Sequence, residues 1–208
     1  MLSPLIAHFP KIAHSPLPIN VGKYLNLPRL KCDFLQFKSL NALTVFRILF
    51  GIVWIINGAM KFVFFHPYNI VIVNMIKTVS QGQPAWLQGW FNFWVSTVSS
   101  SPVAFLYMAG AIELALGLAL IAGFLRKIVY VAGILDGLLI WSIFEGFGGP
   151  YGVGSTDVGT AIPYIFVFIL LIIAETTANY SKYSLDAVIE RKWKGWSRLA
   201  ELHKDEAQ

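Results

Sequence analysis

The sequence predicts an all-α integral membrane protein whose core is a four-helix bundle. Hydrophobic residues make up 56% of the 208 positions and charged residues only 13%, against about a quarter in an ordinary soluble domain. Mean hydropathy is +0.63, so a water-soluble globule would have too little polar surface to cover its core. Four apolar stretches are long enough to cross about 30 Å of hydrocarbon, which takes about 20 helical residues. The composition therefore argues against a soluble enzyme.

The predicted membrane domain is residues 42–181, and its four helices span about 42–65, 103–125, 127–147 and 160–181. Arg126 and Lys127 form a tight basic turn between the second and third helices, which makes those helices antiparallel neighbours. Pro102 and Pro163 fall in first helical turns, where proline costs little.

Basic residues set the predicted orientation, because connections rich in lysine and arginine stay on the cytoplasmic side. They are concentrated in an arm at residues 1–41, in the turn between the second and third helices, and in a tail at residues 182–208. The connections at about 66–102 and 148–159 contain one basic residue between them, Lys77. We therefore expect a multi-pass protein of the cell membrane with both termini in the cytoplasm.

The two flanking segments differ in pattern. Prolines interrupt any long helix in the arm, which is expected to be mostly irregular; they are Pro4, Pro10, Pro16, Pro18 and Pro28. The tail repeats apolar residues with cations between them, namely Leu185, Ile189, Trp193, Trp196 and Leu199. That pattern is typical of a basic amphipathic helix on the anionic inner leaflet, and a subunit contact explains it equally well.

The first outer connection is uncharged from residue 78 to 112, and Trp86, Trp90 and Trp94 recur in it every four residues. A fifth crossing over 78–98 would place the basic arm or the basic tail outside, against the charge rule. The sequence therefore favours a helix in the outer interface, with its tryptophans at headgroup depth.

Ionisable residues inside the predicted helices are the candidate functional groups, because a charge in hydrocarbon is costly and usually faces protein or water. Arg47 and Lys61 share one side of the first helix with Gly51, Trp54 and Gly58, so that side should pack against helices rather than lipid. Matching depth predicts a structural ion pair between Arg47 and Glu175, while Lys61 lies towards the outer side, near Glu145.

Glu113 and Asp136 are the candidate catalytic residues. Both lie near mid-membrane, each flanked by glycines, and no cation is expected at their depth. Two facing carboxyls in a low-dielectric setting resist ionisation, so at least one could donate a hydrogen bond or carry a proton. The alternative is that they only set helix register.

The second outer connection has six glycines among residues 146–160. Successive amides in such a loop can form an anion-binding nest at the start of the fourth helix. The candidate substrate-binding residues are Lys61, Gly152, Gly154, Thr156 and Asp157. The alternative is a tight turn in which Asp157 or Thr160 caps the fourth helix.

Three stretches resemble the DoxX/DoxD family of membrane proteins. They are Arg47-Ile-Leu-Phe-Gly-Ile-Val-Trp-Ile-Ile-Asn-Gly-Ala-Met-Lys61-Phe, Glu113-Leu-Ala-Leu-Gly-Leu-Ala-Leu-Ile-Ala-Gly-Phe-Leu-Arg126 and Gly149-Pro-Tyr-Gly-Val-Gly-Ser-Thr-Asp-Val-Gly-Thr160. The last looks most like the DoxD branch, the small subunit of thiosulfate:quinone oxidoreductase. The resemblance implies a four-helix subunit that works with a DoxA-type small subunit. It also implies oxidation of thiosulfate to tetrathionate outside the cell and reduction of membrane quinone, which feeds a terminal quinol oxidase.

The expected cofactor is quinone, as a diffusible electron acceptor. Cys32 is the single cysteine, the four histidines lie near or outside the ends of the apolar stretches, and no nucleotide-binding motif is present, so we expect no metal, haem or nucleic acid on this chain. The expected partners are the small subunit, the lipid bilayer and terminal oxidase subunits. A non-catalytic assembly or anchoring subunit of a respiratory oxidase complex is the competing hypothesis.

Overall fold

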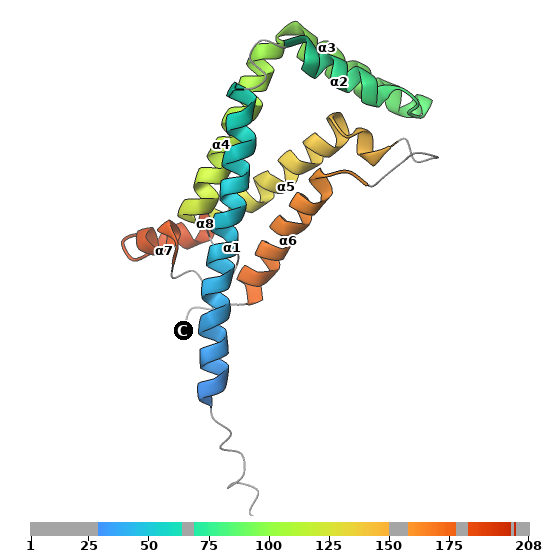
Figure 1. Cartoon of the computed structure of the whole chain (residues 1–208). Helices are drawn as coiled ribbons and strands as arrows, with labels where there is room; N and C mark the ends of the chain where they lie inside the picture. The colour runs from blue at the N-terminus through green and yellow to red at the C-terminus, as the bar shows by residue number, and fades with distance from the viewer. Residues whose placement is uncertain (1–28, 64–68, 150–157, 178–182, 201, 203–208) are drawn as a thin grey trace, which may run out of the picture. The chain divides into compact units, whose positions relative to one another are not determined.

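The computed structural model describes residues 29–63, 69–149, 158–177, 183–200 and 202. The chain divides into two units, residues 1–36 and 37–208, and the packing below is that of the second unit. The helices are α1 Arg29–Val63, α2 Asn69–Ser80, η2 Ala85–Leu87, α3 Gln88–Ser100, α4 Pro102–Ala122, α5 Arg126–Ile143, η3 Gly146–Gly148, α6 Ala161–Thr177, α7 Leu185–Glu190, η5 Lys194–Trp196 and α8 Ser197–Ala200 (Figure 1). Those residues contain no strand, which confirms the all-α prediction.

Two of the described helices are long and apolar enough to cross a membrane, Ala42–Val63 within α1 and Pro102–Ala122, which is α4. Only 28% and 33% of their most apolar windows are buried, so neither is the core helix of a soluble fold. Helix α5 has 18 residues but includes three ionisable ones, and the described α6 has 17. The described part of each predicted stretch is mainly helical, while four crossings stay a prediction.

Helices α1 and α4 touch through glycines. A Cβ atom added at Gly51 would lie 2.8 Å from the carbonyl oxygen of Gly117, and one added at Gly58 would lie 2.8 Å from that of Gly110. Since seven residues separate the glycines on each helix, the two close approaches are two turns apart and run antiparallel. Small residues allow this backbone contact, and it is the packing face that the sequence predicts for α1.

Helices α5 and α6 lie side by side (Figure 1), and Gly133 and Gly137 face Phe168 and Ile165 across their contact. Aromatic rings then join α6 to α1, with the ring centroids of Phe50 and Phe168 4.9 Å apart. The buried core shared by α1, α4, α5 and α6 consists of Phe50, Trp54, Leu116, Leu120, Val129, Tyr130, Phe168 and Leu171.

The connection between α1 and α4 contains two short α-helices, α2 and α3, and not the single interfacial helix that the sequence predicts. The helix is interrupted between α2 and α3 by Gly82, at φ +76°, and by Pro84. The two helices have 12 and 13 residues, or about 20 Å each, which is too short to cross the hydrocarbon. The pair shares a second hydrophobic core with Leu106 of α4 and Ile143 of α5, and Trp90 Nε1 donates to the Ser142 carbonyl of α5 at 3.3 Å. Residues 78–98 therefore do not form one continuous helix, and the number of crossings stays a prediction.

Three further segments differ from the prediction. Helix α1 begins at Arg29, so the last part of the arm is helical; residues 1–28 lie outside the described part. Arg126 is not a turn residue but the first residue of α5, 1% exposed, because Gly123 at φ +64° already ends α4. The tail is three short helices instead of one, since Arg191–Trp193 interrupt it.

Gly117→Ala should destabilise the protein by about 1–3 kcal/mol, as overpacking usually does. The new methyl would lie 2.7 Å from the Gly51 carbonyl oxygen, and a backbone atom cannot move aside without separating α1 from α4. Thermal unfolding in detergent would measure this. Gly89→Ala on α3 is the matched control, because nothing lies within 4 Å of its added Cβ. Equal melting temperatures for the two variants would contradict the close helix contact.

Candidate functional site

A buried ion pair joins α1 to α4. The Lys61 Nζ atom donates to Glu113 Oε2 at 2.5 Å, with the Glu113 side chain 3% exposed and that of Lys61 24% exposed. Each residue stands one helical turn beyond a glycine of the α1–α4 contact, Gly58 and Gly110 respectively. Because the two helices run antiparallel, Lys61 and Glu113 start from opposite sides of the Gly58–Gly110 contact, and the long Lys61 side chain spans this offset to reach the carboxylate.

Asp136 of α5 completes a three-residue cluster with Lys61 and Glu113. It interacts electrostatically with both of them, and its Oδ2 atom is buried with no hydrogen-bond partner among the described residues. Buried carboxylate oxygens almost always have a partner. The cluster thus contains an acceptor that is open to a proton or to the polar group of a bound molecule.

The cluster agrees with one part of the sequence prediction and corrects another. Glu113 and Asp136 do interact, as their equal depth predicts. The expectation that no cation reaches them is wrong, because Lys61, expected to lie near Glu145, pairs with Glu113. The flexible four-carbon stem of a lysine lets its ammonium group act at some distance from its own Cα atom, which helix depth alone does not capture.

Glu145 instead caps helix α6. Its carboxylate accepts hydrogen bonds from the Thr160 and Ala161 amides at 3.0 Å, and from the Thr160 hydroxyl. The first amides and the positive dipole end of α6 are thereby occupied by a protein carboxylate. Of the predicted caps, Thr160 takes part as a donor. Four of the predicted substrate-binding residues lie outside the described part of the chain: Gly152, Gly154, Thr156 and Asp157.

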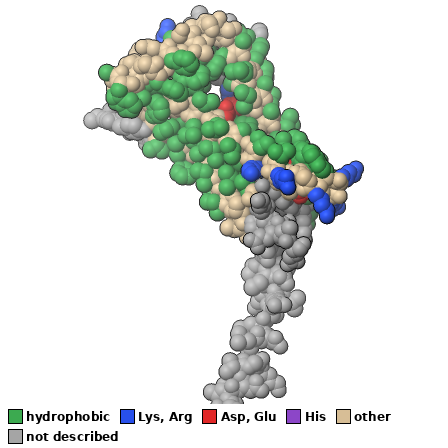
Figure 2. Space-filling view, turned by 180° about the vertical axis from the view of Figure 1, so that it is seen from behind, with side chains coloured by type: hydrophobic (Ala, Val, Ile, Leu, Met, Phe, Trp, Pro, Cys, Tyr) green, Lys and Arg blue, Asp and Glu red, His purple; other side chains and the backbone are tan. Residues whose placement is uncertain are grey.

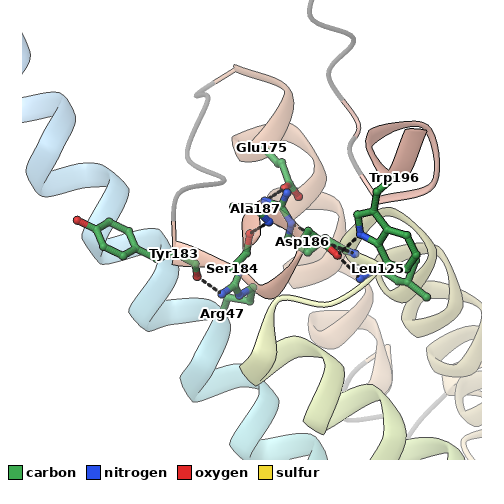
Figure 3. Close-up of polar contacts among 9 residues, drawn as sticks. Arg47, Leu125, Glu175, Tyr183, Ser184, Asp186, Ala187 and Trp196 are labelled. Carbon is green, nitrogen blue, oxygen red and sulfur yellow. Dashed lines mark hydrogen bonds and ion pairs between the residues drawn. The ribbon is translucent and has the colours of Figure 1, made fainter. Parts of the chain in front are cut away.

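A second buried charge cluster lies where the tail meets the α4–α5 turn (Figure 3). Arg126 forms ion pairs with Glu175 of α6 and, at 3.1 Å between Nε and Oδ2, with Asp186 of α7. The Asp186 carboxylate also accepts from the Leu125 amide at 2.8 Å and from Trp196 Nε1 at 2.9 Å. Asp186 is fully buried, so one carboxylate holds the start of α5 and the tail together.

Glu175 therefore pairs with Arg126. The prediction from helix depth, which paired Glu175 with Arg47, is wrong. Arg47 Nη2 donates to the Tyr183 carbonyl oxygen at 3.1 Å. Arg126 lies in the first turn of α5, the helix that packs along α6, and so takes the carboxylate that Arg47 was expected to hold. Sequence reasoning missed Arg126 and Asp186. Ser184, whose side chain caps α7, was the local signal that Asp186 lies in the first turn of a helix.

These features, long exposed apolar helices with ion pairs held between them, are those of an α-helical membrane protein. The DoxX family model matches residues 42–146, which is half of the sequence, and the chain belongs to the DoxX family. The match includes Lys61, Glu113, Asp136 and Arg126, while α6 and the tail lie beyond it. No curated protein and no solved structure matches the chain significantly.

Lys61→Met should destabilise the protein by about 3–5 kcal/mol, because it leaves the buried Glu113 carboxylate without its cation. Adding Glu113→Gln should recover much of that loss, whereas adding Glu145→Gln should not. Double-mutant cycles on melting curves would measure the coupling energies. Coupling of Lys61 to Glu145 in place of Glu113 would contradict the ion pair.

Proposed function

We propose that this chain is the membrane subunit of a thiosulfate:quinone oxidoreductase, and that quinone is reduced beside Lys61, Glu113 and Asp136. The observation that carries the proposal is a buried Asp136 oxygen that has no hydrogen-bond partner in the part of the chain that the structure describes, and that interacts with an ion pair between apolar helices. Ionisable groups are expensive in a membrane and are retained mostly where they act on ions, protons or ligands.

The chemistry of quinone reduction requires proton donors inside the membrane. Oxidation of two thiosulfate ions to one tetrathionate releases two electrons, and a quinone takes up two electrons and two protons to become a quinol. Asp136 is suited to donate a proton to a quinone oxygen. Lys61, about a quarter exposed while its partner is buried, is suited to return protons from the surface to the carboxyls.

Support for thiosulfate as the electron donor comes from the resemblance of residues 149–160 to the DoxD branch. In the structure, both positive features at which the anion was expected to bind already have a carboxylate partner. The Lys61 ammonium is already paired with Glu113, and the start of α6 is capped by Glu145. A thiosulfate dianion would have to displace a carboxylate at either place. We therefore assign thiosulfate binding to the interface with a DoxA-type small subunit, on the outer side.

An assembly or anchoring subunit of a respiratory oxidase complex is the second candidate. The fully buried Asp186, which ties the tail to the turn between α4 and α5, favours it. A rigidly held, exposed tail is what a scaffolding protein needs. The two candidates differ in whether the Lys61–Glu113–Asp136 cluster affects turnover.

Asp136→Asn should slow quinone reduction about 10²–10⁴-fold, the usual contribution of a general acid. Its fold should survive, because the oxygen it replaces makes no hydrogen bond to the described chain. Thiosulfate-dependent quinone reduction by the purified complex would be measured with and without the small subunit. Asp136→Glu, which keeps a carboxyl, should lose far less, and Lys77→Gln on exposed α2 should lose nothing. Normal turnover in Asp136→Asn would favour the assembly role.

The proposed topology places both termini in the cytoplasm and the α2–α3 pair outside. Trp86→Cys, at a side chain 79% exposed, should react with a membrane-impermeant thiol reagent applied to intact cells. Lys194→Cys, on the exposed tail, should react only after the cells are opened. Both cysteine variants are made in a Cys32→Ser background, which removes the native thiol from the two measurements. Labelling of Lys194→Cys in intact cells would reverse the orientation.

A further inference from the structure

The tail presents a surface on which cations and large apolar side chains are both exposed. We define the basic tail surface by its four exposed cations, Arg191, Lys192, Lys194 and Arg198. Exposed apolar side chains lie among them in the sequence, with Leu185 43%, Val188 53%, Trp193 57% and Leu199 48% exposed. Figure 2 shows lysine and arginine side chains gathered around hydrophobic ones at this part of the molecule.

This surface is held in a fixed position. Asp186 accepts from Leu125, Arg126 and Trp196, and its own amide donates to the Gly123 carbonyl oxygen at 3.1 Å. The Trp196 ring packs on Phe124 with centroids 5.6 Å apart. The buried side of the tail is therefore used for attachment, and the cations stand on the side left over.

The attachment point sets the depth of the surface relative to a membrane. Gly123 directly follows α4, one of the two helices long enough to cross a bilayer. Next to that turn, Leu118 of α4 is 61% exposed and Ile128 of α5 is 48% exposed. If α4 crosses the hydrocarbon, its end lies at the headgroups, and the tail fastened there lies at the same level.

We propose that the basic tail surface binds the phosphate headgroups of anionic phospholipids. The cations match the charge of the phosphates, and Trp193 and the leucines match the boundary between headgroups and acyl chains, where tryptophan is enriched. Among the described tail residues, Asp186 is fully buried and Glu190 is half-buried, whereas all four cations are exposed. Positive charge therefore predominates on the exposed face. The inference does not depend on quinone chemistry.

The test compares lipid binding by the full-length protein and a fourfold variant, Arg191→Gln/Lys192→Gln/Lys194→Gln/Arg198→Gln. Protein in nonionic detergent is titrated with dioleoyl phosphatidylglycerol or dioleoyl phosphatidylcholine, and native mass spectrometry gives the apparent dissociation constants. A basic residue near an anionic surface contributes about fivefold in affinity, so the variant should bind phosphatidylglycerol more than tenfold more weakly. Its affinity for phosphatidylcholine should not change.

Lys77→Gln removes an equally exposed cation from α2 and should leave phosphatidylglycerol binding unchanged. Unfolding curves without added lipid should superpose for the wild type and the fourfold variant, because the four side chains make none of the attachment contacts. Raising the salt concentration from about 0.1 M to 1 M should weaken phosphatidylglycerol binding by the wild type, since the Debye length falls to about 3 Å.

Two results would overturn the proposal. The first is unchanged phosphatidylglycerol affinity in the fourfold variant, or affinity of the wild type that does not respond to salt. The second is normal lipid binding together with loss of a co-purifying subunit from the variant, which would make the surface a protein contact.

Discussion

The buried guanidinium of Arg126 organises one end of the structure. Moving a charge of this kind out of water costs several kcal/mol unless ion pairs and hydrogen bonds replace its hydration. Arg126 is 1% exposed and meets carboxylates from two other segments, Glu175 of α6 and Asp186 of α7. Helix α5 therefore cannot take its position unless α6 and the tail also take theirs. Loss of one partner would leave a charge buried alone, a change that costs about 3–5 kcal/mol.

The same constraint operates at Lys61 and Glu113, but there it is only partly met. The glycine contact between α1 and α4 fixes the distance between their side chains, and the resulting ion pair satisfies one carboxyl. Asp136 interacts with that pair, and its buried Oδ2 atom has no hydrogen-bond partner among the described residues. Asp186 in the Arg126 cluster differs, because its carboxylate accepts four hydrogen bonds. Figure 2 shows acidic and basic atoms in a hollow among hydrophobic side chains.

The sequence was sufficient to predict where the helices lie, but not which buried charges on them form ion pairs. Apolar run length, Pro102 at the start of α4 and the glycines of α1 and α4 are local signals, and they predicted where those helices lie and which faces pack. Pairing depends on helix rotation and side-chain reach, which are not local. Matching helix depth predicted an ion pair between Glu175 and Arg47, because Arg126, beside Lys127, has the sequence pattern of a solvated turn residue. Asp186 belongs to a tail with six cations and has the sequence pattern of a surface charge, but the turn at Gly123 brings it to Arg126 in the structure.

The hydrogen bonding of Asp186 and Asp136 also distinguishes a carboxylate that stabilises the fold from one that is suited to chemistry. A carboxylate with all its hydrogen bonds made, such as Asp186, gains nothing from a further proton and resists exchange with a substrate. A carboxylate with an unmatched oxygen, such as Asp136, is stabilised by any proton or donor that arrives. The proposed quinone chemistry therefore belongs with Lys61, Glu113 and Asp136, where the Lys61 side chain is about a quarter exposed. The Arg126 cluster instead joins the start of α5 to α6 and to the tail through two buried ion pairs.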